Sequence, residues 1–183
     1  MSICLNMIVK NEANNLERLF ASLYKYIDYF VISDTGSTDQ TIEILYDLGK
    51  LYNVPGKVLS HAWVDFGYNR QLALEAAIQA KNAKEHDCEW LLIIDADEEL
   101  ITIDKLWKIK LQEGWSYTTF KKLGGLSYKN LFLLWIESQQ WQWQGVVHEY
   151  LLNPSNLHKK KHTNDVCIMA HQFEGSNSRR FED

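Results

Sequence analysis

Short apolar runs alternate with longer stretches of helical periodicity over the first half of the chain. Apolar runs of this length predict buried strands, and apolar residues recurring every three or four positions predict helices that cover the sheet. Four strands separated by helices predict a parallel sheet with helices on both faces. The predicted strands are 3–9, 29–33, 57–63 and 90–95, and the predicted helices are 14–26, 38–51 and 66–83, followed by a short helix that Asp104 caps.

From Gly114 onwards the pattern changes to strands without intervening helices. We therefore predict one α/β domain over 1–183, with a mostly parallel sheet in 1–112 and a more antiparallel half in 113–183. The segment HKKKH, 158–162, is expected to be a solvated loop. The strands predicted for the second half are 115–120, 131–135, 141–147 and 166–172.

Composition narrows the class of protein. A chain of 183 residues is long enough for one domain with a real core, and its net charge of −5 argues against nucleic acid as the main partner. No apolar run approaches the length of a transmembrane helix, and the N-terminus does not resemble a signal peptide. The three cysteines are far apart, which predicts reduced thiols and a cytoplasmic location.

Polar side chains follow three of the predicted strands. Lys10-Asn11-Glu12 follows the first strand, Asp34 the second and Asp95 the fourth. Parallel α/β sheets bind ligands outside the carboxyl ends of their strands. We therefore expect these groups to line one cleft, in which Asp34 either accepts a hydrogen bond from a ribose or base, or only stabilises a turn.

Asp95-Ala96-Asp97 offers two carboxylates at the end of a buried strand. Mg²⁺ and Mn²⁺ prefer oxygen ligands, and Mg²⁺ is commonly held by one or two carboxylates together with phosphates of the substrate. The pair is a candidate metal site for a diphosphate substrate. The alternative is that these acids cap the next helix and remain solvated. We expect Glu99 to be solvated and Glu98 to be a partner of the metal ligands.

Other candidates lie outside the strand ends. Arg70 sits near the start of a helix, against the preference of the helix dipole, which indicates either an anion such as a diphosphate or a surface ion pair with Asp65 or Glu75. Glu149 is a candidate general base or a structural carboxylate. His171 follows an apolar strand and can complete a metal shell or be an ordinary histidine. Trp141 and Trp143 can face a sugar or the core.

Five segments of the chain, in this order, resemble the family 2 glycosyltransferases of the GT-A fold. The resemblance covers roughly 3–152 and is looser over 170–180. Departures are Gln71 in the third segment and Asn130-Leu131-Phe132 before the last. The segments are MIVKNEANNLERLFASL, VISDTGSTDQTIEI, WVDFGYNRQLAL, WLLIIDADEEL and WQWQGVVHEYL.

The resemblance implies a hexosyltransferase of glycan biosynthesis, with a nucleotide-diphospho-sugar donor, UDP-linked by default, and Mn²⁺ or Mg²⁺. The acceptor would be a glycan, a lipid-linked molecule or a protein, and the reaction inverting. It implies a nucleotide-sugar-binding half in 1–112, an acceptor-side half in 113–183, and possible membership of a longer protein. The implied roles are metal ligands Asp95, Asp97 and His171 (or His148), donor contacts Lys10, Asn11, Glu12, Asp34, Arg70 and Asp95, and base Glu149.

Three other classes compete with this interpretation. A sugar-nucleotide or glycan-binding module would keep the fold without turnover. A sugar-phosphate nucleotidyltransferase would need a glycine-rich loop after the first strand, where this chain has Lys10-Asn11-Glu12. A phosphohydrolase with a paired-aspartate motif would carry the pair after its first strand, whereas here it follows the fourth.

Overall fold

The computed structural model describes residues 1–137, 140–146, 149–154 and 159–171. Their helices are α1 (Leu16–Leu23), α2 (Thr41–Tyr52), α3 (Phe66–Asn82) and the 3₁₀ helix η1 (Trp107–Lys110). Their strands are β1 (Ile3–Val9), β2 (Tyr29–Asp34), β3 (Gly56–Ser60), β4 (Trp90–Ile93), β5 (Glu98–Thr102), β6 (Trp115–Leu123), β7 (Leu126–Trp135), β8 (Gln142–Gln144), β9 (Tyr150–Leu152) and β10 (Lys159–Ala170).

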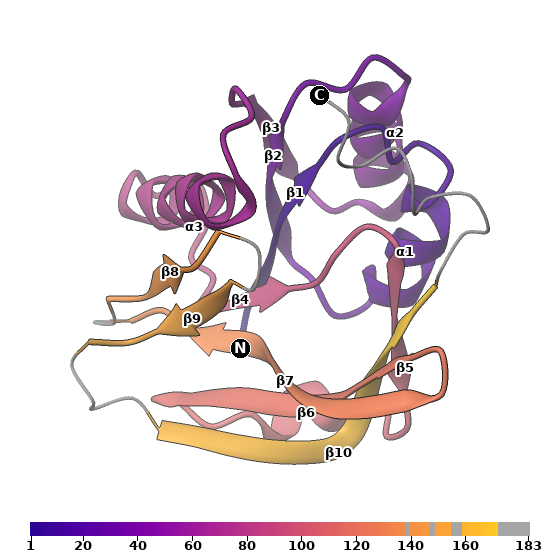
Figure 1. Ribbon diagram of the computed structural model, residues 1–183. Coiled ribbons are helices and arrows are strands. Elements are labelled where there is room, and N and C mark those ends of the chain that lie inside the picture. Colours follow the sequence, from indigo (N-terminus) through magenta and orange to yellow (C-terminus); the bar gives the residue numbers. More distant parts are fainter. Residues whose placement is uncertain (138–139, 147–148, 155–158, 172–183) are drawn as a thin grey trace.

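An eight-stranded sheet in the order β3-β2-β1-β4-β7-β6-β10-β5 forms the body of the molecule (Figure 1). The first four strands of that order run parallel, as the alternation of apolar runs and helices predicts. β7 joins β4 antiparallel, and the β6–β7 and β5–β10 pairs are antiparallel as well, while β6 and β10 run parallel. The predicted α/β class, with a parallel first half and a more antiparallel second half, is confirmed.

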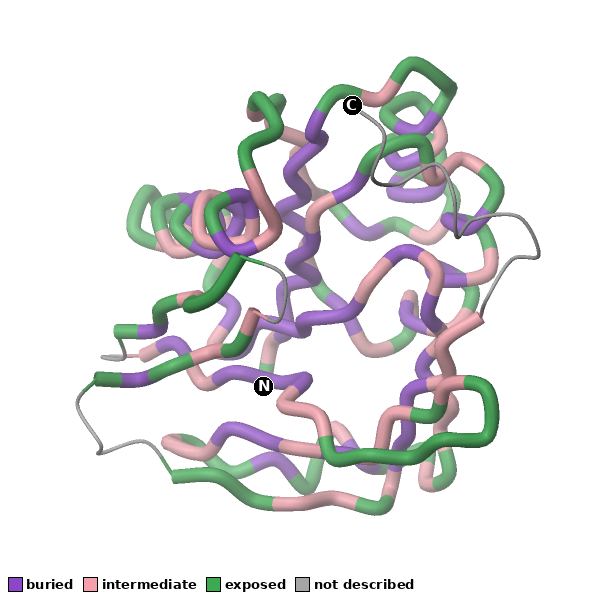
Figure 2. The backbone as a smooth tube through the Cα atoms, viewed as in Figure 1, coloured by how far each residue is buried: buried purple, intermediate pink, exposed green. Residues whose placement is uncertain are grey.

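Two apolar clusters cover the two faces of the sheet. On one face, Leu16 of α1 and Leu45 of α2 pack with Ile3 and Leu5 of β1. On the other face, the small side chains of α3 pack against Cys4 and its neighbours, so that α3 lies on the opposite side of the sheet from α1 and α2 in Figure 1. Because β1 and β4 contribute side chains to both clusters, these strands are buried along nearly their whole length (Figure 2).

Two parts of the second half differ from the prediction. Residues 159–162 belong to β10 and pair with Trp115–Thr118 of β6, so the lysines predicted to lie in a loop stand on a strand. Pairing with β6 engages their backbone on one side, whereas β5 pairs with Val166–Ala170 further along β10. The lysine side chains are exposed at this margin of the sheet, where lysine is common. In addition, Glu98 begins strand β5 instead of preceding a helix, and β8 and β9 form a separate two-stranded sheet.

The three cysteines, Cys4, Cys88 and Cys167, are buried and unbridged. Among the described residues, the longest apolar helical stretch falls short of what a membrane crossing requires.

Candidate active site

The loops after β1 and β2 are bound to each other at the carboxyl edge of the sheet. Val9 pairs with Asp34, and the amide of Thr35 donates to the carbonyl of Val9. The side-chain oxygen of Asn11 accepts from the backbone amide of Thr38, and the backbone amide of Asn11 donates to the Ser37 hydroxyl. Asn11 adopts a positive φ of 56°, a conformation that asparagine tolerates better than most residues. The two loops therefore form one polar surface.

Asp34 stabilises the turn that follows β2. Its side-chain oxygens accept from the amides of Gly36 and Ser37, and Asp34 itself is almost fully buried. Glu12 accepts from the side chain of Asn15, and Lys10 is exposed at the loop. The structure thus brings Lys10, Glu12 and Asp34 to one edge, with Asp34 bonded to the backbone of its own turn.

Helix α3 places Arg70 between two carboxylates. Asp65 caps the helix by accepting from the amide of Tyr68. The Nη2 of Arg70 lies 2.8 Å from Oδ1 of Asp95, and its Nε lies 2.9 Å from Oε1 of Glu149. Burial alone lowers the pKa of the Arg70 guanidinium, but attraction to the two carboxylates outweighs it and raises that pKa. Arg70 therefore pairs with neither Asp65 nor Glu75.

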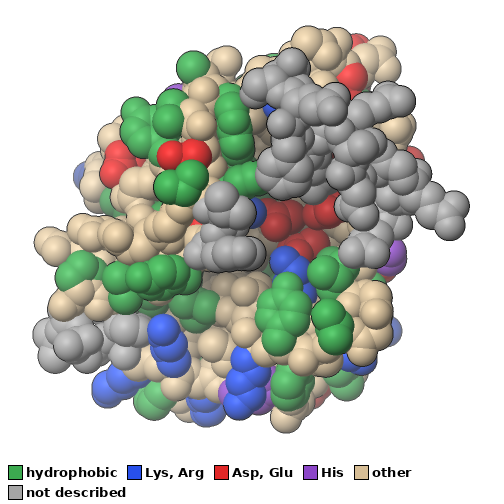
Figure 3. Space-filling view, viewed as in Figure 1, with side chains coloured by type: hydrophobic (Ala, Val, Ile, Leu, Met, Phe, Trp, Pro, Cys, Tyr) green, Lys and Arg blue, Asp and Glu red, His purple; other side chains and the backbone are tan. Residues whose placement is uncertain are grey.

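Three acids gather at the end of β4. Side-chain oxygens of Asp95, Asp97 and Glu98 all lie within 4.8 Å of one another. The amide of Asp95 donates to Oε2 of Glu98 at 3.0 Å, and the amide of Glu98 donates back to the carbonyl of Asp95, which fixes the turn between β4 and β5. Figure 3 shows acidic side chains in a hollow at the centre of this face, with basic ones beside them.

Lys121 of β6 is the cation next to this group. Its ammonium is ion-paired with Glu98 and lies 4.0 Å from Oδ2 of Asp95. Burial and the nearby charge of Asp95 raise the pKa of the Glu98 carboxyl to about 7. Burial also lowers the pKa of the Lys121 ammonium, but attraction to Glu98 and Asp95 outweighs this and raises it. The acid group thus carries fewer negative charges at neutral pH than its three carboxylates suggest.

His171 lies beside the acid group without joining it. Its amide donates to the carbonyl of Asp97 at 3.0 Å, but its Nε2 lies 3.1 Å from Oε2 of Glu99. Glu99 is therefore a partner of His171, which the sequence analysis did not predict. His148, the other candidate histidine, lies outside the described residues.

The β8–β9 hairpin positions Glu149 over α3. Trp143 places its ring 5.3 Å from the guanidinium carbon of Arg70, and its amide donates to the side chain of Gln71 at 2.8 Å. A methyl group on Gly67 would lie 2.1 Å from the carbonyl oxygen of Gly145, so only glycine permits this close approach. Trp141 is buried in the core, whereas Trp143 stacks on Arg70.

Sequence reasoning did not identify Lys121 or the contact of Gln71. Lys121 stands in a run, KKLGG, with no recognisable motif, and its role depends on how β6 lies beside the end of β4. The sequence marked Gln71 only as a departure from the family pattern. In the structure its side chain accepts a hydrogen bond from the amide of Trp143 and so helps to hold the hairpin on α3.

Comparison with known proteins identifies the family. Residues 4–107 match the sequence model described as glycosyl transferase family 2. A TPR repeat-containing protein of Synechococcus elongatus is 37% identical over 102 residues, which is 55% of this chain and 21% of that protein. An uncharacterized glycosyltransferase of Rickettsia bellii is 37% identical over 94 residues, 51% of this chain and 27% of that protein. The matched part thus spans only about a fifth to a quarter of these relatives.

Two solved structures are similar in outline. TarS of S. aureus, residues 1–349, has a TM-score of 0.48 and 22% identity, covering 67% of this chain and 36% of that one. Glucosyl-3-phosphoglycerate synthase from Mycobacterium tuberculosis, in complex with Mn²⁺, UDP and glucosyl-3-phosphoglycerate, has a TM-score of 0.43 and 20% identity, covering 67% of this chain and 45% of that one.

Proposed function

The chain belongs to glycosyl transferase family 2, and on that premise we propose that its site moves a sugar from a nucleotide-diphospho-sugar to an acceptor hydroxyl with the help of a divalent metal ion. The observation that carries the proposal is the position of Arg70, which links Asp95 of the acid group to Glu149. A guanidinium suited to phosphates, a group of oxygen ligands and a separate carboxylate thereby lie within one site.

The donor set fits a hard cation. Asp95, Asp97 and Glu98 offer only carboxylate oxygens, closely enough spaced to share one ion, and no thiol or imidazole competes within the group. Asp95 and Asp97 would be the ligands, with Glu98, which Lys121 already engages, beside them. When bound, Mn²⁺ or Mg²⁺ would offset the charge of the diphosphate and support the departing nucleotide as a Lewis acid.

Arg70 has two tasks in this proposal. It orients the carboxylate of Glu149, and it presents a fixed positive charge next to Asp95, where the diphosphate of the donor would lie. The side chain of Arg70 is only 11% exposed, so its charge is poorly screened by water and acts strongly on a nearby anion. Stacking by Trp143 holds the guanidinium in this orientation.

Glu149 would act as the general base. Its carboxylate takes the proton of the acceptor hydroxyl as the hydroxyl oxygen forms a bond to the anomeric carbon. The bond from that carbon to the diphosphate oxygen breaks, and its electron pair leaves with the nucleotide diphosphate. Attack opposite the leaving group inverts the anomeric centre. The ion pair with Arg70 holds the Glu149 carboxylate in a fixed position.

The nucleoside would bind at the edge formed by the loops after β1 and β2. Lys10, Asn11 and Glu12 stand on that edge, and the buried Asp34 fixes its shape through the amides of Gly36 and Ser37. We propose UDP as the nucleotide and a hexose as the sugar, with His171 shaping the metal site through its bond to the Asp97 carbonyl. The acceptor would be a glycan, a lipid-linked molecule or a protein.

A thermal-shift panel of sugar nucleotides with and without Mn²⁺ tests the proposal, because a ligand that binds the folded state raises the melting temperature. At least one donor should stabilise the wild type only when Mn²⁺ is present, and Asp97→Ala should remove that shift. Asp47→Ala, which changes an exposed acid of α2, is the control and should keep it. An undiminished shift in Asp97→Ala would rule out the metal role of this acid.

A further inference from the structure

Three large aliphatic side chains are exposed within seven residues around η1. Ile103 is 67% exposed, Leu106 is 60% and Ile109 is 68%. Single exposed aliphatics are ordinary on protein surfaces, but a group of them usually marks a surface that something else covers. These side chains belong to none of the elements that form the proposed transferase site, so the chemistry proposed above does not account for them.

Lysines lie in the same segment as these aliphatics and on the neighbouring strand β10. Lys105 is exposed next to Leu106, and Lys159 and Lys161 stand on β10, opposite Trp115 and Tyr117 of β6. Trp115 and Tyr117 pack in the same cluster as Trp107 of η1, so alternation along β10 places Lys159 and Lys161 on the face that carries η1. Together Ile103, Lys105, Leu106, Ile109, Lys159 and Lys161 form what we call the η1 surface.

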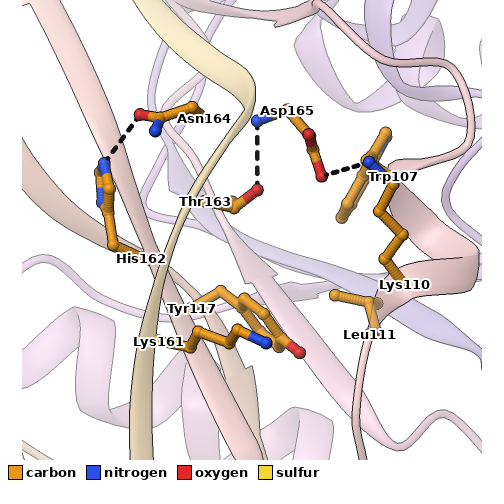
Figure 4. Close-up of a pocket in the computed structure, with 9 residues that line it drawn as sticks. All are labelled: Trp107, Lys110, Leu111, Tyr117, Lys161, His162, Thr163, Asn164 and Asp165. Atoms are coloured by element: carbon orange, nitrogen blue, oxygen red, sulfur yellow. Dashed lines mark hydrogen bonds and ion pairs between the residues drawn. The ribbon is translucent and has the colours of Figure 1, made fainter.

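The two segments of the η1 surface face each other across one hollow. A cavity of about 270 Å³ is lined by Trp107, Lys110 and Leu111 on one side and by residues 161–165 of β10 on the other (Figure 4). The amides of Ile103 and Asp104 donate to the carbonyl of Asp165, which joins the segments directly. The segment that carries the aliphatics therefore lies next to the strand that carries Lys159 and Lys161.

The charge of this surface is opposite to that of the whole chain, whose net charge is −5. Its acids are largely neutralised, because Lys108 pairs with Asp28 and Lys110 pairs with both Asp104 and Asp165. Glu113 remains nearby as an exposed acid. Within the described residues no ion pair engages Lys105 or Lys161, so the remaining charge of the surface is positive.

We infer that the η1 surface docks on an anionic lipid bilayer. Aliphatic side chains that enter the boundary of the acyl chains, with lysines around them at the level of the head groups, are the physical requirements of interfacial membrane binding. The cavity beside Lys161 offers room for a head-group phosphate. Protection of the sheet margin at this end of β10 would explain its lysines but not the exposed aliphatics of the neighbouring segment. A nucleic acid would bind the lysines without covering the aliphatics.

Flotation with vesicles tests the inference and is independent of transferase activity. The wild type should float with vesicles of phosphatidylglycerol and phosphatidylcholine, bind pure phosphatidylcholine at least tenfold less, and detach as salt rises. The double variant Leu106→Gln/Ile109→Gln, which leaves the charge unchanged, should bind anionic vesicles at least tenfold less. Leu51→Gln, which changes a 71% exposed leucine of α2, is its control and should bind normally.

The lysines are tested separately. Lys159→Gln/Lys161→Gln should weaken binding to anionic vesicles by roughly tenfold or more, since each lysine near such a surface contributes about 1 kcal/mol, or roughly fivefold. Lys160→Gln changes the lysine between them, on the opposite face of β10. It should weaken binding less than Lys159→Gln alone or Lys161→Gln alone. Failure of the wild type to bind anionic vesicles, equal binding by the Leu106/Ile109 double variant, or stronger binding to RNA or an acidic protein would each overturn the inference.

Discussion

The Nε of Arg70 donates to Oε1 of Glu149 at 2.9 Å, although the two residues are 79 positions apart in the chain. The same guanidinium contacts Asp95 through Nη2, so a single side chain of α3 connects the end of β4 with the β8–β9 hairpin. Arg70 therefore holds the candidate base and the acid group in one arrangement through direct contacts to both.

Replacing Arg70 by lysine should impair turnover while leaving the fold intact. One ammonium cannot reproduce the two bonds that the planar guanidinium makes to Asp95 and Glu149. Loss of a positioned electrostatic group typically lowers the rate by about 10²–10³-fold. Release of nucleotide from the donor measures the effect, and Lys81→Gln, which removes the Glu137 ion pair from the same helix, is the control. Similar rates in Arg70→Lys and the wild type would show that the two bonds of the guanidinium are not needed for turnover.

Gly67→Ala should disturb the position of Glu149 from a distance. The added methyl group would meet the carbonyl of Gly145 at 2.1 Å, so either α3 or the hairpin must move. Overpacking of this kind costs about 1–3 kcal/mol of unfolding free energy, and the displaced hairpin should also slow turnover. Gln79→Ala, at an exposed position of α3, should affect neither urea unfolding nor turnover. Wild-type stability of Gly67→Ala would show that the contact between Gly67 and Gly145 is not tight.

Lys121→Gln should make the stability of the protein depend on metal. Without Lys121, the acid group loses the cation that pairs with Glu98, which should cost up to about 3 kcal/mol in the presence of a chelator. Mn²⁺ should then raise the melting temperature of the variant more than that of the wild type, because the ion replaces the missing charge. Lys122→Gln, one position further and exposed, is the matched control. Equal Mn²⁺ responses in all three proteins would contradict this prediction.

Glu98 should make stability fall as pH rises. Burial and the charge of Asp95 raise its folded pKa to about 7, above the value of about 4.3 expected in an unfolded chain. The folded state therefore retains a proton that the unfolded state loses, and stability present below pH 4 declines until pH 7. With a metal chelator present, the free energy of unfolding of the wild type should fall by up to about 3 kcal/mol relative to that of Glu98→Gln between pH 5 and 8. If the urea unfolding curves of both proteins changed with pH in the same way, the raised pKa of Glu98 would be refuted.

The prediction of the first half from sequence succeeded because its signals are local. An apolar run from Trp90 to Ile94 followed directly by Asp95 fixes both a buried strand and the place where its acids emerge. The carboxyl ends of parallel strands share an edge, so Asp34 and Asp95 could be assigned to one side of the sheet without knowing any contact.

The remaining features depend on packing between distant segments. Lys121 reaches Glu98 only because β6 pairs with β10, which in turn pairs with β5, and no pattern around KKLGG encodes that pairing. Arg70 and Glu149 were each singled out, but their ion pair depends on how the hairpin lies on α3. Glu98 and Glu99 were expected ahead of a helix, whereas strand alternation sends one toward Lys121 and the other toward His171.

The most direct test of the account is the release of nucleotide diphosphate from a sugar-nucleotide donor in Mn²⁺ by the wild type and by Glu149→Gln, with donor binding measured in parallel. We predict that Glu149→Gln binds the donor normally but releases nucleotide at least about 10²-fold more slowly, as the loss of a general base requires. Glu137→Gln, which changes a partly exposed acid that pairs with Lys81, should behave as the wild type. Donor binding without turnover by the wild type, or equal rates in the wild type and Glu149→Gln, would contradict it.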